Sequence, residues 1–298
     1  MAHAESAVAA GRGVSARRSA VGQSAWTGAA ARALVTLLAL AALWGLWEAY
    51  RWIGVRTELT WPFPVDDVTM PHIHSVFQAL FEPSRVNGPL LITVLLESAW
   101  FTAKEALLGF ALGATIGFAI GIVLAHSRLL QRGFLPYIVA SQTVPILAIA
   151  PMVVVWLKSG WLSVAVIAAY LTFFPVTINT LRGLLSADPR ALELMRSYAA
   201  SPWSVLWKLR VPAAMPYLFS ALKVSATASV VGAIIGELPS SIQDGLGGAI
   251  LNFAQYYSIQ PTGLWATNLV AALLGIAFFA AVVVAEKLLV RRAPENVA

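Results

Sequence analysis

The sequence predicts an all-α, polytopic membrane protein with six transmembrane helices. Apolar residues make up 59% of the 298-residue chain and charged residues only 11%, whereas charged residues are about a quarter of an average soluble domain. Several apolar runs reach the roughly 20 residues that a helix needs to cross a bilayer. Cysteine is absent, which excludes disulfides and thiolate metal sites.

The N-terminal third is predicted to hold one spanning helix and one external loop. Residues 1–30, rich in Ala, Gly and Ser, show no periodic apolar face and are expected to form a flexible cytoplasmic N-terminus. The apolar run 31–53 is the first predicted span, with Glu48 either reaching the interface or paired with a neighbouring helix. Residues 54–89 contain five prolines, which interrupt helices, so a loop is expected there. His72 and His74 are interpreted as solvated residues of that loop rather than metal ligands.

The second span is predicted at 105–125, preceded by a leading segment over 90–104. Glycine recurs there every four residues, at Gly109, Gly113, Gly117 and Gly121. This spacing puts the glycines on one helix face, where a second backbone can approach closely. The pattern therefore predicts a buried helix contact and not a substrate site.

The third span, predicted at 134–157, is interrupted by prolines. Proline frees backbone carbonyls, which are tolerated at membrane depth only where other helices or an aqueous cavity satisfy them. Gln142, Thr143 and Pro145 are therefore candidates for a solute path, and a kinked packing helix explains the same residues equally well. The later spans, predicted at 161–181, 213–238 and 264–288, add the path candidates Asn179, Lys223 and Glu237.

Two further segments are polar or glycine-rich. Residues 239–250, which lack the spacing of a phosphate-binding loop, are interpreted as an external turn. Residues 183–212 separate two apolar runs. In them Asp188 precedes Pro189 and Ser201 precedes Pro202, as helix N-caps precede a first helical proline. Two short helices are predicted there, ending near Pro212.

This second segment resembles the cytoplasmic loop of permease subunits of binding-protein-dependent ABC importers. Their pattern is Glu-Ala-Ala, three residues, Gly, nine residues, Ile-x-Leu-Pro. Glu193 stands at the Glu position and residues 209–212 at the closing four positions, whereas Leu194 and Met195 replace the alanines and Ala199 replaces the glycine. The flanking residues are similar to permeases of the nitrate, sulfonate and taurine group, and the resemblance covers about residues 70–290.

The resemblance implies a fold, a partner set and a contact surface. The fold is that of type I (MetI-like) importers, and residues 183–212 are a cytoplasmic coupling loop within a permease domain over 31–292. The implied partners are two ATPase subunits, which bind ATP and Mg, a second permease copy in a homodimer, and an external or periplasmic substrate-binding protein. This chain itself is expected to bind no cofactor and no metal. The implied ATPase contacts are Glu193, Leu194, Met195, Ala199, Ala200, Ser201, Leu209 and Pro212.

Basic residues predict the orientation, because cytoplasmic loops carry an excess of Lys and Arg. With six spans, both termini and the coupling loop share one side, which is predicted to be the cytoplasmic side of a bacterial inner membrane. That side holds Arg12, Arg17, Arg18, Arg32, Arg128, Arg132, Arg182, Arg190, Arg196, Lys208, Arg210, Lys287, Arg291 and Arg292, and the other holds Arg51, Arg56, Arg85 and Lys158.

The predicted function is that of a non-enzymatic permease subunit of an ATP-driven importer, since no Walker A pattern occurs in the chain. One alternative, an ion-coupled secondary transporter, needs acidic groups near the bilayer midplane, and these spans offer almost none there. The other, an intramembrane enzyme, needs paired ionisable groups, but Lys223 and Glu237 lie about 20 Å apart on one helix. The substrate class stays open between a small anion, nitrate-, sulfonate- or taurine-like, and a small nitrogen heterocycle. Resemblance of residues 237–250 to the pyrimidine branch slightly favours the heterocycle.

Overall fold

The computed structural model describes residues 31, 34–57, 64–85, 87–158, 160–240 and 242–290. The expected N-terminal segment 1–30 lies outside the described residues. Within the described part the chain is helical, and the only strand-like feature is an isolated bridge between Pro83 and Leu90. These residues fall into two units that divide between Ile73 and His74. Each unit is described by itself.

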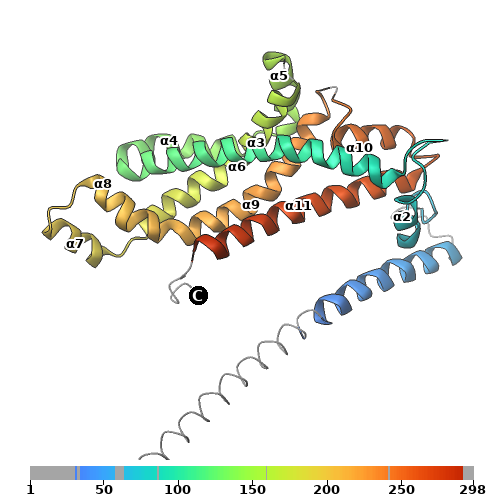
Figure 1. Cartoon of the computed structure of the whole chain (residues 1–298), viewed down its shortest axis with the longest axis horizontal. Helices are drawn as coiled ribbons and strands as arrows, with labels where there is room; N and C mark the ends of the chain where they lie inside the picture. The colour runs from blue at the N-terminus through green and yellow to red at the C-terminus, as the bar shows by residue number, and fades with distance from the viewer. Residues whose placement is uncertain are drawn as a thin grey trace, which may run out of the picture. The chain divides into compact units, whose positions relative to one another are not determined.

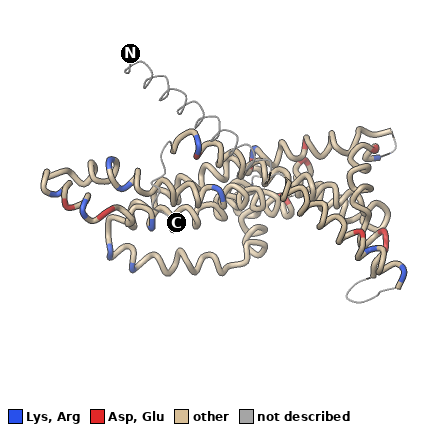
Figure 2. The backbone as a smooth tube through the Cα atoms, turned by 90° about the horizontal axis from the view of Figure 1, so that it is seen from below, with Lys and Arg blue, Asp and Glu red and all other residues tan. Residues whose placement is uncertain are grey.

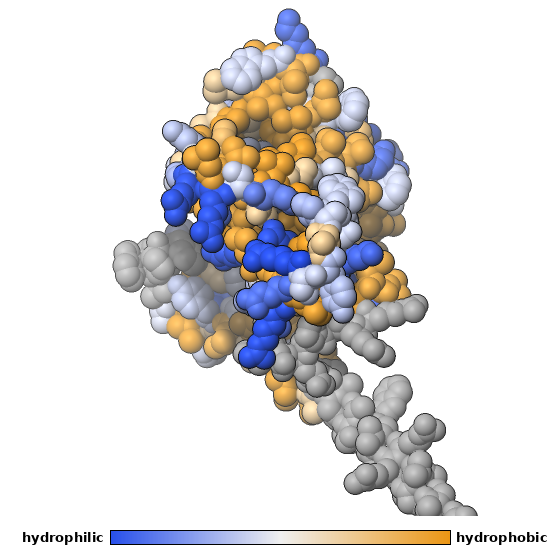
Figure 3. Space-filling model, turned by 90° about the vertical axis from the view of Figure 1, so that its left-hand side faces the viewer, coloured by the Kyte–Doolittle hydropathy of each residue, from blue (hydrophilic) through white to orange (hydrophobic). Residues whose placement is uncertain are grey.

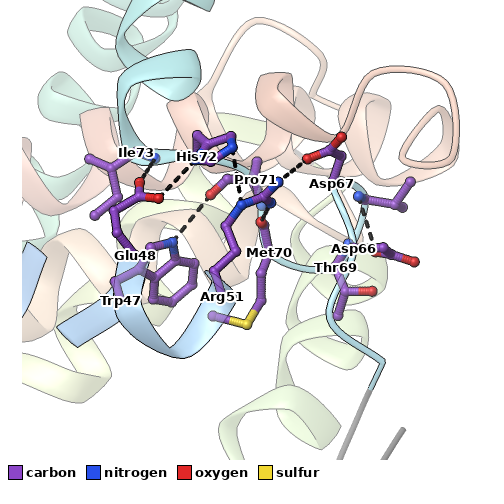
Figure 4. Close-up of polar contacts among 11 residues, drawn as sticks. Trp47, Glu48, Arg51, Asp66, Asp67, Thr69, Met70, Pro71, His72 and Ile73 are labelled. Atoms are coloured by element: carbon purple, nitrogen blue, oxygen red, sulfur yellow. Dashed lines mark hydrogen bonds and ion pairs between the residues drawn. The ribbon is translucent and has the colours of Figure 1, made fainter. Parts of the chain in front are cut away.

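The first unit contains an apolar helix, Leu34–Arg56, long enough to cross a membrane. The segment that follows it folds back onto its C-terminal end (Figure 4). The buried Arg51 donates hydrogen bonds to the Met70 carbonyl oxygen, to Asp67 and to Nε2 of His72. Nδ1 of His72 lies 2.8 Å from Glu48 Oε2. Glu48 and His72 are thus paired with each other, and the His72 side chain stays 41% exposed in an irregular segment, as expected of a solvated loop residue.

The second unit contains the helices that carry the coupling loop (Figure 1). They are α2 (Ile73–Ala79), α3 (Leu91–His126), α4 (Arg128–Ser141), α5 (Ile146–Leu157), α6 (Gly160–Leu185), α7 (Pro189–Ser197), α8 (Pro202–Val205), a π-helical turn (Leu206–Arg210), α9 (Val211–Glu237), α10 (Leu246–Gln255) and α11 (Pro261–Leu289). Figure 1 shows α7 and α8 at one end of this unit and α10 at the other. Figure 2 shows long uncharged stretches along the helices between these ends.

Across the described residues, five helices are long and apolar enough to cross a membrane, or six if α4 and α5 form one broken span. The all-helical, polytopic class is therefore confirmed. One predicted boundary differs from the structure. The second span does not begin at residue 105, because α3 runs unbroken from Leu91. The charged residues near its middle do not interrupt the helix, and no proline or glycine precedes Gly109 in it.

The third predicted span is not one continuous helix. Its residues form α4 and α5, which meet at an angle of 96°. Pro136 and Pro151 lie inside α4 and α5 without ending either helix. The break occurs instead at residues 142–145, where Pro145 has no N–H to continue the hydrogen bonds of α4.

The glycine face of α3 packs directly on α6, as its spacing predicted. A Cβ atom on Gly109 would lie 2.4 Å from Ala168 Cβ, and one on Gly113 would lie 2.5 Å from the Ala169 carbonyl oxygen. Gly117 and Gly121 meet later turns of α6 equally closely. The absence of side chains at these positions therefore sets the distance between the two helices.

Candidate functional site

Both helices of the coupling loop begin at the caps that the sequence predicted. The Asp188 carboxylate accepts a hydrogen bond from the Arg190 N–H at 2.9 Å, and Pro189 opens α7. The Ser201 hydroxyl oxygen accepts from the Ser204 N–H at 3.3 Å, and Pro202 opens α8. Each cap satisfies a backbone donor that the first helical turn leaves free.

Ala199 ends α7 in a left-handed backbone conformation, with φ of 49°. Its N–H bonds to the Arg196 carbonyl oxygen at 2.9 Å, and the Ala200 N–H bonds to the Met195 carbonyl oxygen at 3.0 Å. This pair of bonds is the Schellman helix end, which usually has glycine at the left-handed position because other residues are strained there. The left-handed backbone of this turn explains why the permeases that this segment resembles have glycine at the same position.

The second helix of the loop does not end near Pro212, as the sequence had suggested. Instead α8 passes through the π-helical turn into α9, and Pro202–Glu237 reads as one 36-residue helix. The Val211 N–H bonds to the Leu206 carbonyl oxygen, five residues back. Such a turn widens the helix and accommodates Pro212, which cannot donate a backbone hydrogen bond. Leu206 is buried with Leu184 and Ala214 and anchors the loop to the bundle.

The outer surface of the coupling loop is rich in exposed apolar and aromatic side chains. Tyr198 is 77% exposed and Trp203 is 68% exposed, and Leu194 is also open to solvent. The rings of Trp203 and Trp207 lie edge to face with centroids 5.7 Å apart. Figure 3 shows hydrophilic and apolar residues side by side on this end of the molecule.

The sequence-predicted contact residues lie along this loop, but not all on its surface. Glu193, Leu194, Ala199, Ser201 and Pro212 are exposed, whereas Met195, Ala200 and Leu209 are half-buried. Tyr198 was not among the predicted contacts, although its position beside the Ala199 turn and its aromatic side chain were visible in the sequence.

The break between α4 and α5 brings three path candidates together. Gln142 caps the end of α4, Pro145 opens α5, and Thr143 lies between them. The side chains of Gln142 and Thr143 are exposed. The Tyr170 hydroxyl of α6 donates a hydrogen bond to the Ser141 carbonyl oxygen, which ties the break to the bundle.

The other path candidates are not gathered at this break. The Asn179 side-chain amide donates to the Pro175 carbonyl oxygen of its own helix at 2.9 Å. Lys223 of α9 forms a 2.7 Å ion pair with Glu286 of α11, a partner that the sequence reasoning missed. Glu237 is enclosed by the helices of unit 2 and is 1% exposed, which does not fit its expected place on a solute path.

The glycine-rich segment 239–250 is a turn only in the described residues of its first half. From Leu246 it forms α10, whose first turn is buried against α3, α9 and α11. The interpretation of the whole segment as a turn was wrong. Glycine usually ends helices, whereas here the glycines, which lack side chains, let α10 pack closely against its neighbours. A Cβ atom on Gly247 would lie 2.6 Å from the Ile234 carbonyl oxygen.

Comparison with known proteins gives consistent matches over unit 2. The model of the family "Binding-protein-dependent transport system inner membrane component" matches residues 89–293. A formylaminopyrimidine transport permease of Halalkalibacterium halodurans is 32% identical over 70% of this chain and 86% of its own length. A riboflavin transport system permease of Chloroflexus aurantiacus is 32% identical over 64% of this chain and 70% of its own. A putative aliphatic sulfonates transport permease of Bacillus subtilis is 28% identical over 74% of each chain.

A solved structure shares the fold. A chain of the MetNI methionine ABC transporter in inward facing conformations matches with a TM-score of 0.58 and 17% identity, over 66% of this chain and 96% of that one. At this identity the match speaks for the arrangement of helices alone.

Proposed function

Since the chain belongs to the family of binding-protein-dependent transport system inner membrane components, we propose that its coupling loop docks on a separate ATPase subunit and transmits the movement of that subunit to the membrane helices. The protein is the permease subunit of a binding-protein-dependent ABC importer. ATP and Mg would be bound by two such ATPases, and a substrate-binding protein would deliver solute from the other side.

The observation that carries this proposal is that the loop has an exposed apolar surface and continues into α9 without a break in the helix. Exposed apolar side chains gathered on one surface outside the bilayer mark a protein contact, and Leu194, Tyr198 and Trp203 are all exposed on this loop. Trp203 and Trp207 belong to the 36-residue helix that continues as α9. A displacement of these side chains would therefore be transmitted along the continuous helix to α9.

We propose further that the break at residues 142–145 lines the solute path where two copies of the chain meet. Irregular backbone with exposed polar side chains does not face lipid within the hydrocarbon region, because its polar groups would have no partner there. Gln142 and Thr143 are exposed in the single subunit. The Thr143 hydroxyl already donates to the Ala140 carbonyl oxygen at 2.7 Å, so a second copy, or water between the copies, would provide partners for the Gln142 amide.

Replacing Gln142 with Leu tests the path. We expect transport to fall about tenfold or more while the protein reaches the membrane in normal amount, because one path hydrogen bond to a polar solute is worth roughly 1–3 kcal/mol. Gln131→Leu in α4 is the matched control. Uptake of labelled solute and membrane abundance are the readouts, and unchanged uptake by the Gln142 variant would contradict the assignment.

For the substrate we propose a small nitrogen heterocycle ahead of a small anion. The supporting relatives at 32% identity are named for formylaminopyrimidine and riboflavin, whereas those named for sulfonates and nitrate are 28% and 23% identical. A ligand screen on the cognate binding protein, followed by uptake assays, distinguishes the two classes.

We propose an orientation with both termini and the coupling loop in the cytoplasm of a bacterial cell. The chain has no native cysteine, so single cysteines report sidedness cleanly. Ser197→Cys, in α7, is expected to react with an impermeant maleimide only in inverted vesicles. Gln243→Cys, before α10, is expected to react only from outside in intact cells or spheroplasts. Labelling of both from one side would contradict this topology.

A further inference from the structure

Two carboxyl groups lie buried inside unit 2, outside the coupling loop and the broken span. Glu105 of α3 is 3% exposed and Glu237 of α9 is 1% exposed. They are the buried carboxylates of the described residues, and neither belongs to an ion pair there. Burying a charge without a counter-charge is costly, so the pair requires a chemical explanation.

Glu237 occupies a site built to accept hydrogen bonds. Its Oε1 accepts from the Thr102 hydroxyl at 2.7 Å, and its Oε2 accepts from the Gly247 N–H at 2.5 Å. The Thr102 oxygen in turn accepts from the Leu246 N–H at 2.9 Å. A Cβ atom on Gly245 would lie 2.3 Å from the carboxyl carbon of Glu237. The start of α10 is thus wrapped around this carboxylate, where the helix N-terminus favours negative charge.

Glu105 faces the same place, and its side-chain hydrogen-bonding partner there is the Glu237 carboxyl group, whereas its oxygens accept no hydrogen bond from any described donor. It follows Thr102 by three residues, so the two side chains lie one above the other on α3. Thr102 already contacts Glu237, and the electrostatic interactions of Glu105 are with Glu237 and Lys104. Both oxygens of Glu105 are buried.

Among the residues that the structure describes, no cation forms an ion pair with either carboxyl group. Lys104 is exposed, and its Nζ lies 5.3 Å from the centre of the Phe101 ring. Asp244, next to the start of α10, is exposed and would only add negative charge. Two carboxylates close together in a buried site cannot both stay ionised, because each disfavours the charge of the other.

We propose that Glu105 and Glu237 form a proton-binding site that holds one proton, with Glu105 as the neutral acid and Glu237 as the carboxylate. The two hydrogen bonds accepted by Glu237 stabilise its ionised form, whereas Glu105 receives none. The proton lets α3, α9 and α10 pack together at the end of the unit opposite the coupling loop. Its removal would place a second negative charge in the packed interior and separate α10 from α3.

Infrared spectroscopy of the full-length permease in lipid nanodiscs tests the proposal directly. At neutral pH we expect a protonated-carboxyl C=O band in the wild-type protein that is lost in Glu105→Gln. Glu97→Gln, which changes an exposed carboxyl of the same helix, is the control and should keep the band. Absence of the band from the wild-type protein overturns the proposal whether or not any variant folds. A band that disappears on adding Na⁺ or K⁺ overturns it in favour of a cation site.

The pH dependence of stability gives a second readout. If the folded protein holds one proton more than the unfolded chain, its folding equilibrium falls up to about tenfold per pH unit as pH rises. The melting temperature of the wild-type protein should therefore fall from about pH 5, above the ordinary pKa of an unfolded glutamate, to about pH 8, and that of Glu105→Gln should fall less. Equal falls in both proteins contradict the assignment of the proton to Glu105.

Discussion

A permease carrying Gly113→Ala is expected to melt at a markedly lower temperature than wild type and to accumulate poorly in the membrane. The added Cβ would lie 2.5 Å from the Ala169 carbonyl oxygen and 2.6 Å from Thr172 Cβ. Neither neighbour can yield cheaply, since one is helix backbone and the other is a buried residue of α6. Overpacking of this kind costs about 1–3 kcal/mol, and this contact joins two of the central helices of unit 2.

The matched control is the same substitution at Gly275 of α11, where a Cβ atom would meet nothing within 4 Å. Alanine is favoured over glycine inside a helix by about 1 kcal/mol, so Gly275→Ala should be neutral or stabilising. Gly109→Ala, one turn from Gly113 on the same face, should resemble Gly113→Ala. Thermal unfolding in detergent and membrane abundance are the measurements. Equal melting temperatures for Gly113→Ala and Gly275→Ala would refute the assigned α3–α6 contact.

The second large effect is expected at the corner of the coupling loop. Ala199→Trp should leave the permease inserted in normal amount and abolish most of its transport and substrate-stimulated ATP hydrolysis. Ala199 is exposed in the permease alone, so a larger side chain there meets solvent rather than the bundle. In a docked complex the same side chain would overfill the contact, which typically costs about 1–3 kcal/mol and weakens docking about 5- to 150-fold.

Ala199→Gly separates the effect of the left-handed backbone at this residue from the effect of its small side chain. Glycine removes the strain of the left-handed position and keeps the corner small, so coupling should be retained or improved. ATPase binding, ATP hydrolysis in proteoliposomes and uptake should fall together in the Trp variant. None of the three should fall in the Gly variant. A Trp variant that binds its ATPase and transports at the wild-type rate would falsify the docking proposal. Loss of membrane insertion would show instead that the loop is needed for folding.

Several features could be predicted from the sequence because they depend on residues close together in the chain. The caps at Asp188 and Ser201 are set by an acceptor side chain followed by proline. The glycine face of α3 is set by a period of four, which is nearly one helical turn. The membrane class follows from composition, and the family pattern follows from spacing within the coupling loop.

Other features depend on contacts between residues far apart in sequence, and only the tertiary structure decided them. Glu105 and Glu237 are separated by more than a hundred residues and come together because α3 and α9 pack on each other and α10 packs against both. The pairing of Lys223 with Glu286 likewise joins two spans. The 96° bend between α4 and α5, and the joining of α8 to α9 through a π-helical turn, arise where proline removes a donor and packing selects one of several backbone paths. Local sequence specifies where a helix may begin or break, whereas the direction of the chain beyond the break is chosen by the surfaces it buries.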